Sequence, residues 1–208
     1  MTSAPPSTPA EAASRAAASP AARVFPPTGR RVLVSGASRG LGRALAQAFA
    51  ANGDVVAVHF GSRREEAEET LGSLVGTGHV LAGGDLSSPE GAHAVAEAAA
   101  GGLGGLDVLV NNAAVNLPHP LATTSYEDWA TAWQSHVAVN LLATANLSHL
   151  AARRMIEQGA GGRIVNVGSR GAVRGGAPPP ADRATHAAGA PRGPRRGRNH
   201  PPPPQTGA

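Results

Sequence analysis

The sequence predicts an α/β fold: a doubly wound parallel sheet between two layers of helices, a three-layer αβα arrangement that is incomplete at its C-terminal side. Short apolar runs alternate with helical patterns through the middle of the chain, and this alternation indicates strand–helix–strand units with a parallel sheet. A glycine-rich turn follows the first apolar run, and the pattern stops after Arg174. The 208 residues suffice for one domain of ordinary size.

Each strand is expected from a short run rich in β-branched and other apolar residues. The expected strands are Arg31–Ser35, Val55–Phe60, His79–Ala82, Leu106–Val110 and Arg163–Val167. A first helix begins near Leu41, because Leu41, Leu45, Ala48 and Phe49 follow at helical spacing. A solvated, Glu-rich helix covers Arg63 to Val75. A long helix runs from Tyr126 to Gln158, since Ser125 and Asp128 form a capping box ahead of it.

The two ends of the chain differ in composition from the middle, which we assign as the domain, residues 30–174. Residues 1–29 are rich in Ala, Ser and Pro and hold one acid, Glu11. We expect a disordered leader in a cytoplasmic protein, with a chloroplast or mitochondrial transit peptide as the alternative. Of residues 175–208, 27 of 34 are Ala, Pro, Gly or Arg, which predicts a disordered tail. This composition also fits GC-rich DNA read out of frame, so a truncated or frameshifted gene product is a hypothesis.

Composition excludes several classes of chemistry. All 18 basic residues are arginines and there is no cysteine, so lysine Schiff bases, thiolate nucleophiles and disulfides are excluded. Between residues 30 and 170, ten arginines face twelve acidic residues, so the net charge of +4 comes from the two ends. We therefore expect no nucleic-acid partner. The eight histidines are scattered without metal-ligand spacing, and no apolar run reaches membrane-spanning length, so neither a metal nor a membrane is expected.

A glycine-rich turn, Ser-Gly-Ala-Ser-Arg-Gly-Leu-Gly, covers residues 35–42 between the first strand and the first helix. Glycines at positions 36, 40 and 42 permit a tight turn and let the backbone approach a pyrophosphate. The positive amino end of the following helix favours such an anion. The turn therefore predicts a phosphate-binding loop.

That glycine spacing resembles the short-chain dehydrogenase/reductase family, as do Asn111-Asn112-Ala113-Ala114 after the fourth strand, Asn140 in the long helix and Ser169 beyond the last strand. The resemblance covers residues 30–174 and implies a Rossmann-type NAD(P)-binding domain that transfers hydride between nicotinamide and a small carbonyl or alcohol substrate.

The resemblance also implies roles for individual residues. It implies a coenzyme phosphate loop at Gly36, Ser38, Arg39, Gly40, Leu41 and Gly42, adenine contacts from Asp85 and Leu86, and ribose contacts from Asn111, Ala113 and Ala114, with Ala114 in place of the commoner Gly. Asn140 would hold a water in a proton relay, and Ser169 would hydrogen-bond the substrate carbonyl.

The end of the second strand favours NADP(H) over NAD(H). An NAD site usually places an acid about 20 residues beyond the glycine turn to bond the ribose 2′-hydroxyl. Here the strand ends His-Phe-Gly-Ser-Arg-Arg, with no acid before Glu65. Arg39, Ser62 and Arg63 could instead bind a 2′-phosphate. Arg64 is expected to pair with Glu68, four residues on.

The family's catalytic pair, a Tyr and a Lys four residues later, has no counterpart. Asp182 and His186 have that spacing, but an aspartate of pKa about 3.9 is ionised at neutral pH and cannot protonate an alkoxide. The single tyrosine, Tyr126, begins a helix far upstream, where we expect it at the surface. We therefore expect impaired catalysis, with a non-catalytic nucleotide-binding remnant as the alternative. A homo-oligomer through the Tyr126 to Gln158 helix is left open, without support from composition.

Overall fold

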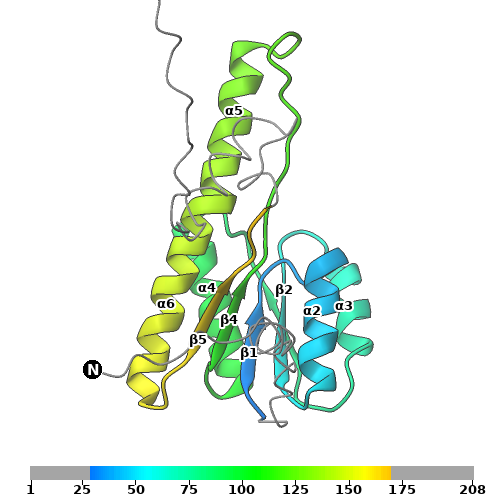
Figure 1. Cartoon of the computed structure of the whole chain (residues 1–208), viewed down its shortest axis with the longest axis vertical. Helices are drawn as coiled ribbons and strands as arrows, with labels where there is room; N and C mark the ends of the chain where they lie inside the picture. Colours follow the sequence, from blue (N-terminus) through cyan, green and yellow to red (C-terminus); the bar gives the residue numbers. More distant parts are fainter. Residues whose placement is uncertain (1–28, 170–208) are drawn as a thin grey trace, which may run out of the picture.

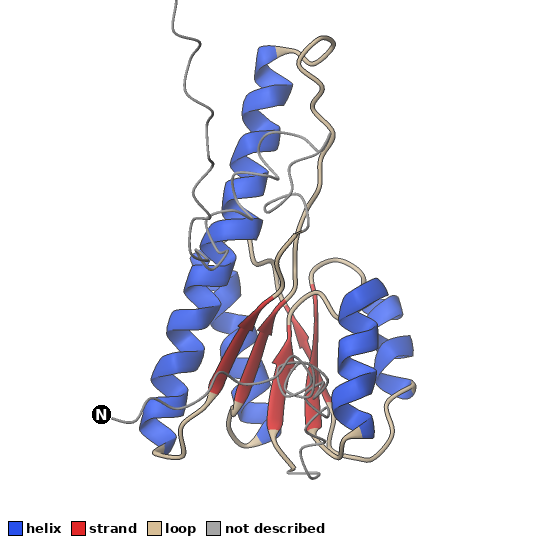
Figure 2. Ribbon diagram, in the orientation of Figure 1, coloured by secondary structure: helices blue, strands red, loops and turns tan. Residues whose placement is uncertain are grey.

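A five-stranded parallel sheet lies between two layers of helices in the computed structural model, which describes residues 29–169 (Figure 2). The strands are β1 (Arg31–Val34), β2 (Val55–Phe60), β3 (Val80–Gly83), β4 (Val108–Asn111) and β5 (Arg163–Asn166). Their order is β3-β2-β1-β4-β5, and every neighbouring pair is parallel. The predicted doubly wound sheet and its strands are confirmed. The predicted leader and tail lie outside the described residues, apart from Gly29.

The helices are divided between the two faces of the sheet (Figure 1). On one face, α2 (Gly40–Ala51) and α3 (Arg64–Gly72) contact β1, β2 and β3. On the other, α4 (Pro89–Leu103) and α6 (Ala143–Gln158) contact the sheet and each other. The helix α5 (Tyr126–His136) continues through a π-helical turn, η1 (Val137–Leu142), into α6. None of the described helices is long and apolar enough to cross a membrane.

The helix α4 is the one described helix that the sequence pattern did not predict, although its boundaries carry local signals. The hydroxyl of Ser88 accepts a hydrogen bond from the Gly91 amide at 3.1 Å, and Pro89 occupies the first turn. Both are typical of helix starts. Gly104 ends the helix with a left-handed φ of 72°. Its alanine-rich sequence hides the apolar stripe that would otherwise mark an amphipathic helix.

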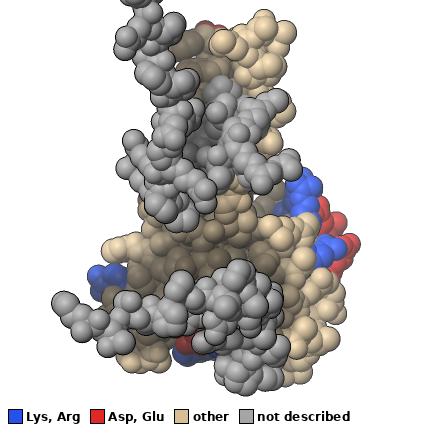
Figure 3. All heavy atoms as spheres, viewed as in Figure 1, with Lys and Arg blue, Asp and Glu red and all other residues tan. Residues whose placement is uncertain are grey.

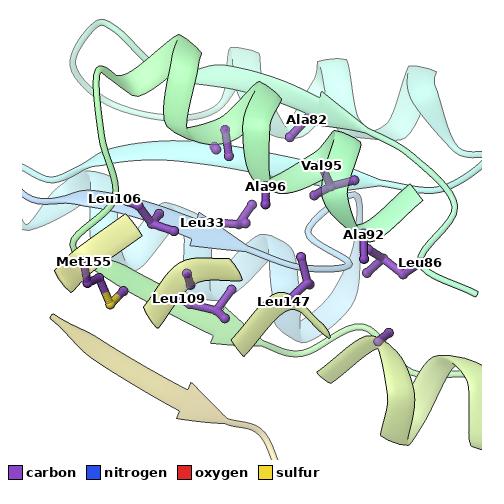
Figure 4. Packing of buried hydrophobic residues seen from close by; sticks show 14 residues of the cluster. Leu33, Ala82, Leu86, Ala92, Val95, Ala96, Leu106, Leu109, Leu147 and Met155 are labelled. Carbon is purple, nitrogen blue, oxygen red and sulfur yellow. The ribbon is translucent and has the colours of Figure 1, made fainter. Parts of the chain in front are cut away.

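Alternate residues of each central strand fill two cores, one on either face of the sheet. Leu33, Ala57 and Leu109 are register neighbours and pack toward α4 and α6 (Figure 4). The residues on either side of Leu33, Val32 and Val34, pack toward α2 and α3. Because both faces are buried, the central strands β1, β2 and β4 are apolar along most of their length, which is typical of parallel sheets.

The buried stripe of α2 differs from the one that the spacing of its large residues suggested. Gly42, Ala46 and Ala50 are buried, whereas Leu41 is 57% exposed. Leu45 and Phe49 pack only at the margin of the core. Small residues at intervals of four let the helix approach the sheet closely, so the larger side chains lie beside the contact.

Two arginine–aspartate pairs fix the amino edge of the sheet. Arg30 donates to both carboxylate oxygens of Asp54, at 3.0 and 2.7 Å, and its backbone amide donates to the same group at 3.1 Å. Arg31 makes the equivalent set of bonds with Asp107. These bonds hold the pKa of Asp107 below its ordinary value, chiefly through the side-chain hydrogen bond from Arg31. The Asp54 side chain is fully buried, so its charge depends on Arg30.

We predict that Asp54→Asn lowers the free energy of unfolding by about 1–3 kcal/mol, because it removes the charge from a buried group that accepts three hydrogen bonds from Arg30. Urea denaturation measures the change. The control is Glu157→Gln, which removes an exposed pair with Arg153 at 3.4 Å and should cost less than about 1 kcal/mol. Equal losses from the two variants would contradict a special role for the buried pair.

Candidate functional site

A cleft of about 640 Å³ opens at the carboxyl edge of the sheet, where β1 and β4 lie side by side. The strand order reverses at this point, and open doubly wound sheets bind their ligands there. The loops after β1, β2, β3 and β4 all contribute to its wall. Its lining includes most of the residues predicted to bind coenzyme: Gly36, Ser38, Arg39, Gly40, Leu41, Gly42, Ser62, Arg63, Asp85, Leu86, Ala113 and Ala114.

Each of the three glycines in the turn after β1 is needed for its own physical reason. A Cβ at Gly36 would lie 2.9 Å from the Cα of Ala113, and one at Gly42 would collide with the Gly36 carbonyl oxygen. Gly40 has a left-handed φ of 56°, and nothing lies within 4 Å of its Cβ position. Gly36 and Gly42 therefore allow close packing of backbone. Gly40 leaves its backbone open at the amino end of α2, where an anion is favoured.

Ser35 and Asn112 join the turn after β1 to the loop after β4. The hydroxyl oxygen of Ser35 accepts from the backbone amides of Asn112 and Ala113, each at 2.9 Å. In return, the side-chain amide of Asn112 donates to the carbonyl oxygens of Ser35 at 2.9 Å and Gly36 at 3.1 Å. The two loops that meet at the floor of the cleft are thus held as one unit.

His59, near the end of β2, links two further loops. Its Nδ1 accepts from the Gly36 amide at 2.8 Å, so the ring proton is on Nε2, which donates to the Gly84 carbonyl at 3.0 Å. The side chain lines the cleft although the residue is only 3% exposed. Burial lowers the pKa of His59 from its ordinary value, against smaller opposing effects of the Gly84 bond and the Asp85 charge. The neutral ring therefore positions the glycine turn.

Basic side chains gather where α2 and α3 meet the cleft, the side of the molecule on which Figure 3 shows charges of both signs. Arg63 donates to Glu66 at 2.7 Å. The guanidinium group of Arg39 makes no hydrogen bond or ion pair with the described residues. Arg64 pairs with Glu68 at 2.8 Å, as the spacing predicted. Two guanidinium groups, those of Arg39 and Arg63, thus line this side of the cleft.

Asp85 and Leu86 form the wall after β3. Asp85 accepts from the hydroxyl of Ser87 at 2.7 Å and from its amide at 2.9 Å. These bonds, the hydroxyl bond first, lower the pKa of Asp85. Leu86 is 5% exposed and belongs to the core beneath α4. The carboxylate is therefore fixed at the cleft by a local turn.

Three predicted site residues do not line the cleft. Asn111 is buried, and its side-chain amide donates to Ser148 of α6 at 3.0 Å and to Asn166 of β5 at 2.9 Å. Asn111 therefore holds β4, β5 and α6 together, a contact that its sequence position alone did not indicate.

Ser169 lies three residues beyond the end of β5, at the carboxyl edge of the sheet.

Asn140, the third of these residues, lies within the π-helical turn η1. Its side-chain oxygen accepts from the Val115 amide at 2.8 Å, and its side-chain nitrogen donates to the Val115 carbonyl at 3.0 Å. Single π-helical turns are frequent at functional sites. Here the turn allows one amide side chain to fix the loop after β4, while its neighbour Val139 lines the cleft.

Sequence reasoning missed Ser35, His59 and Asn112 as site residues. A histidine in an otherwise apolar strand was a usable signal for His59, since a buried polar ring needs partners. The motif Asn111-Asn112 contains a second asparagine, and its position directly after β4 was a usable signal that Asn112 belongs to the site. Among the described residues, no three His, Asp or Glu side chains gather where they could hold a metal.

Comparison with known proteins identifies the family. A family profile described as short chain dehydrogenase matches residues 30–189. The chain belongs to the short-chain dehydrogenase/reductase family. Its match continues past Arg174 into the predicted tail, which lies outside the described residues together with Asp182 and His186.

Relatives in the short-chain dehydrogenase/reductase family are longer than this chain. L-xylulose reductase of Bos taurus is 41% identical over 152 residues, 71% of this chain and 56% of that protein. Nodulation protein G of a Rhizobium species is 35% identical over 152 residues, which are 73% of this chain and 59% of that protein. The chain thus spans little more than half the length of these curated relatives.

Solved structures of the family share the fold. A short chain dehydrogenase from Burkholderia cenocepacia in complex with NADP has a TM-score of 0.69 and 32% identity, covering 79% of this chain and 65% of that one. Acetoin dehydrogenase from Salmonella typhimurium has a TM-score of 0.69 and 30% identity, and the match covers 77% of this chain and 63% of that one. Each match therefore covers more than three quarters of this chain.

Tyr126 lies at the surface, as predicted from its position at the start of a helix. It is the first residue of α5, is 76% exposed and stacks on Trp129 with ring centres 5.9 Å apart. It does not line the cleft. This tyrosine is therefore not placed to exchange a proton with a ligand there.

We predict that Gly42→Ala destabilises the fold by about 1–3 kcal/mol, the usual cost of overpacking, because its methyl group would meet the Gly36 carbonyl and Asn112. Thermal unfolding measures the effect. Gly61→Ala is the matched control, since Gly61 lines the same cleft and has open space at its Cβ position. A loss as large in the control would refute the packing argument.

The stability of the fold should depend on pH through His59. The pKa of His59 in the folded chain is below its ordinary 6.5, so the unfolded chain takes up the proton first as the pH falls. Above about pH 6.5 the ring is neutral in both states and the full stability of the fold is present. As the pH falls below this value, protonation of the unfolded chain lowers the free energy of unfolding. Wild type should therefore lose more melting temperature than His59→Asn between about pH 7.5 and about pH 5.5. Parallel curves for the two proteins would exclude His59 as the titrating group.

Proposed function

We propose that the cleft binds NADP(H) and that the chain derives from an oxidoreductase acting on small carbonyl compounds or alcohols. The observation that carries this proposal is the position of the glycine turn. It lies at the β1/β4 switch point and at the amino end of α2, with Arg39 and Arg63 beside it. Family membership and the NADP bound to the Burkholderia cenocepacia relative support the same ligand class.

The residues that line the cleft fit such a dinucleotide. The backbone at Gly40 and at Gly61 has no neighbouring atom within 4 Å of the Cβ position, so a ligand can approach closely. Arg39, as N-cap of α2, makes no side-chain capping bond. First-turn amides and the helix dipole would then favour a pyrophosphate. Arg39, Ser62 and Arg63 would bind the 2′-phosphate, the basis for preferring NADP(H) to NAD(H).

Catalysis is the part of the family function that we propose to be impaired. A bound nicotinamide supplies hydride transfer to or from a carbonyl carbon. Ser169 would hydrogen-bond the carbonyl, and Asn140 would hold the loop beside it. No lysine occurs in the 208 residues, and the only tyrosine is Tyr126. The family's tyrosine and lysine therefore have no counterpart among these residues, and loss of a positioned proton donor commonly costs about 10²- to 10⁴-fold in rate.

We expect NADPH to raise the melting temperature, because a ligand that binds only the folded state stabilises it, by about 2.7 kcal/mol at 100 times Kd. Arg39→Gln should weaken NADPH binding about tenfold, since it removes a charge-assisted bond. Arg64→Gln is the control, because Arg64 pairs with Glu68 and does not line the cleft. No shift at millimolar NADPH would contradict the proposal.

Turnover separates an active reductase from a non-catalytic nucleotide-binding protein. With NADPH and either L-xylulose or acetoin, substrates suggested by the names of the relatives, we expect loss of nicotinamide absorbance at least about 10²-fold slower than in an intact relative. Comparable rates would overturn the proposed impairment while leaving coenzyme binding intact.

A further inference from the structure

Glu66 pairs with one of the two arginines that line the cleft. Its carboxylate accepts from Arg63 at 2.7 Å, and the two side chains are 34% and 50% exposed. Arg63 lines the cleft, whereas Glu66 does not. An acid of this chain therefore pairs with a cation that the proposed function assigns to the 2′-phosphate of the coenzyme.

The backbone of Glu66 is held against the phosphate loop. Arg43 donates to the carbonyl oxygen of Ser38 at 2.8 Å and to that of Glu66 at 3.1 Å. The hydroxyl of Thr70, which is fully buried, lies 3.0 Å from the Ser38 carbonyl. These bonds hold α3 against the phosphate loop, and the backbone of Glu66 therefore lies beside the cleft.

Arginines surround this carboxylate. The pKa of Glu66 lies below its ordinary value, first because of the hydrogen bond from Arg63, and then, against a contribution from burial, because of the charges of Arg63, Arg39 and Arg43. Two of these arginines, Arg39 and Arg63, line the cleft. An anion is therefore favoured at this point, and Glu66 supplies one in the absence of a phosphate.

We infer that Glu66 is a specificity-determining residue that competes with the 2′-phosphate of the coenzyme for Arg63 and so limits the preference for NADP(H) over NAD(H). This inference rests on the proposed function. A dinucleotide with a free 2′-hydroxyl carries no charge to compete with the carboxylate. One with a 2′-phosphate must share Arg63 or displace Glu66 from it. Glu66 thus opposes the binding of the phosphorylated coenzyme only.

The test compares Glu66→Gln with Glu68→Gln by calorimetric titration with NADPH and with NADH. Glu68 is a matched control, because it makes the same kind of exposed helical ion pair, at 2.8 Å with Arg64, outside the cleft. Glu66→Gln should tighten NADPH binding about two- to fivefold, the usual size of an exposed ion pair, and leave NADH binding unchanged. Glu68→Gln should change neither. The smaller probes 2′,5′-ADP and 5′-AMP should repeat the contrast.

A double-mutant cycle excludes a general effect of charge or folding. In an Arg63→Gln background, Glu66→Gln should no longer change NADPH affinity, because the cation for which Glu66 and the 2′-phosphate compete has been removed. Glu66→Ala should reproduce the effect of Glu66→Gln in the wild-type background. Equal tightening by Glu66→Gln and Glu68→Gln, or equal effects on both coenzymes, would overturn the inference alone. Wild-type chain that binds neither coenzyme would overturn the proposed function and the inference with it.

Discussion

The close packing of the turn after β1 against the loop after β4 is the constraint on which the cleft depends. Two stretches of backbone approach so closely at Gly36 and Gly42 that a Cβ at either position meets the other loop or the turn itself. Ser35 and Asn112 supply hydrogen bonds for the backbone groups exposed where the strands end. Buried backbone groups must be paired, and these side chains pair them where the two strands end.

A second set of contacts fixes this turn to the rest of the carboxyl edge. His59 joins it to the loop after β3, and Arg43 with Thr70 joins it to α3. Asn140 holds the loop after β4 from the opposite side, through the π-helical turn. The cleft wall is therefore set by the fold before any ligand arrives. Such preorganisation lowers the ordering cost of binding.

The cleft and the segment to which the family assigns proton transfer are different parts of the chain. The cleft is built by β1 to β4 and the loops that follow them, all within the described residues. The residues to which the family assigns proton transfer would come after Ser169, where the sequence has neither tyrosine nor lysine. The residues that line the cleft therefore do not include the positions at which the family carries its catalytic pair.

The sequence by itself determined the strands, the glycine turn and the Arg64–Glu68 pair, because each depends on neighbours only a few residues away. The alternation of strands with helices predicted the parallel winding. Tertiary structure decided which side chains act together. Small residues form the buried face of α2. Asn111 and Asn140 hydrogen-bond to other parts of the fold. Arg63 forms an ion pair with Glu66. His59 and Asn112 joined the site through partners 23 and 77 residues distant. Contacts across such separations depend on how strands and helices pack, which local spacing does not encode.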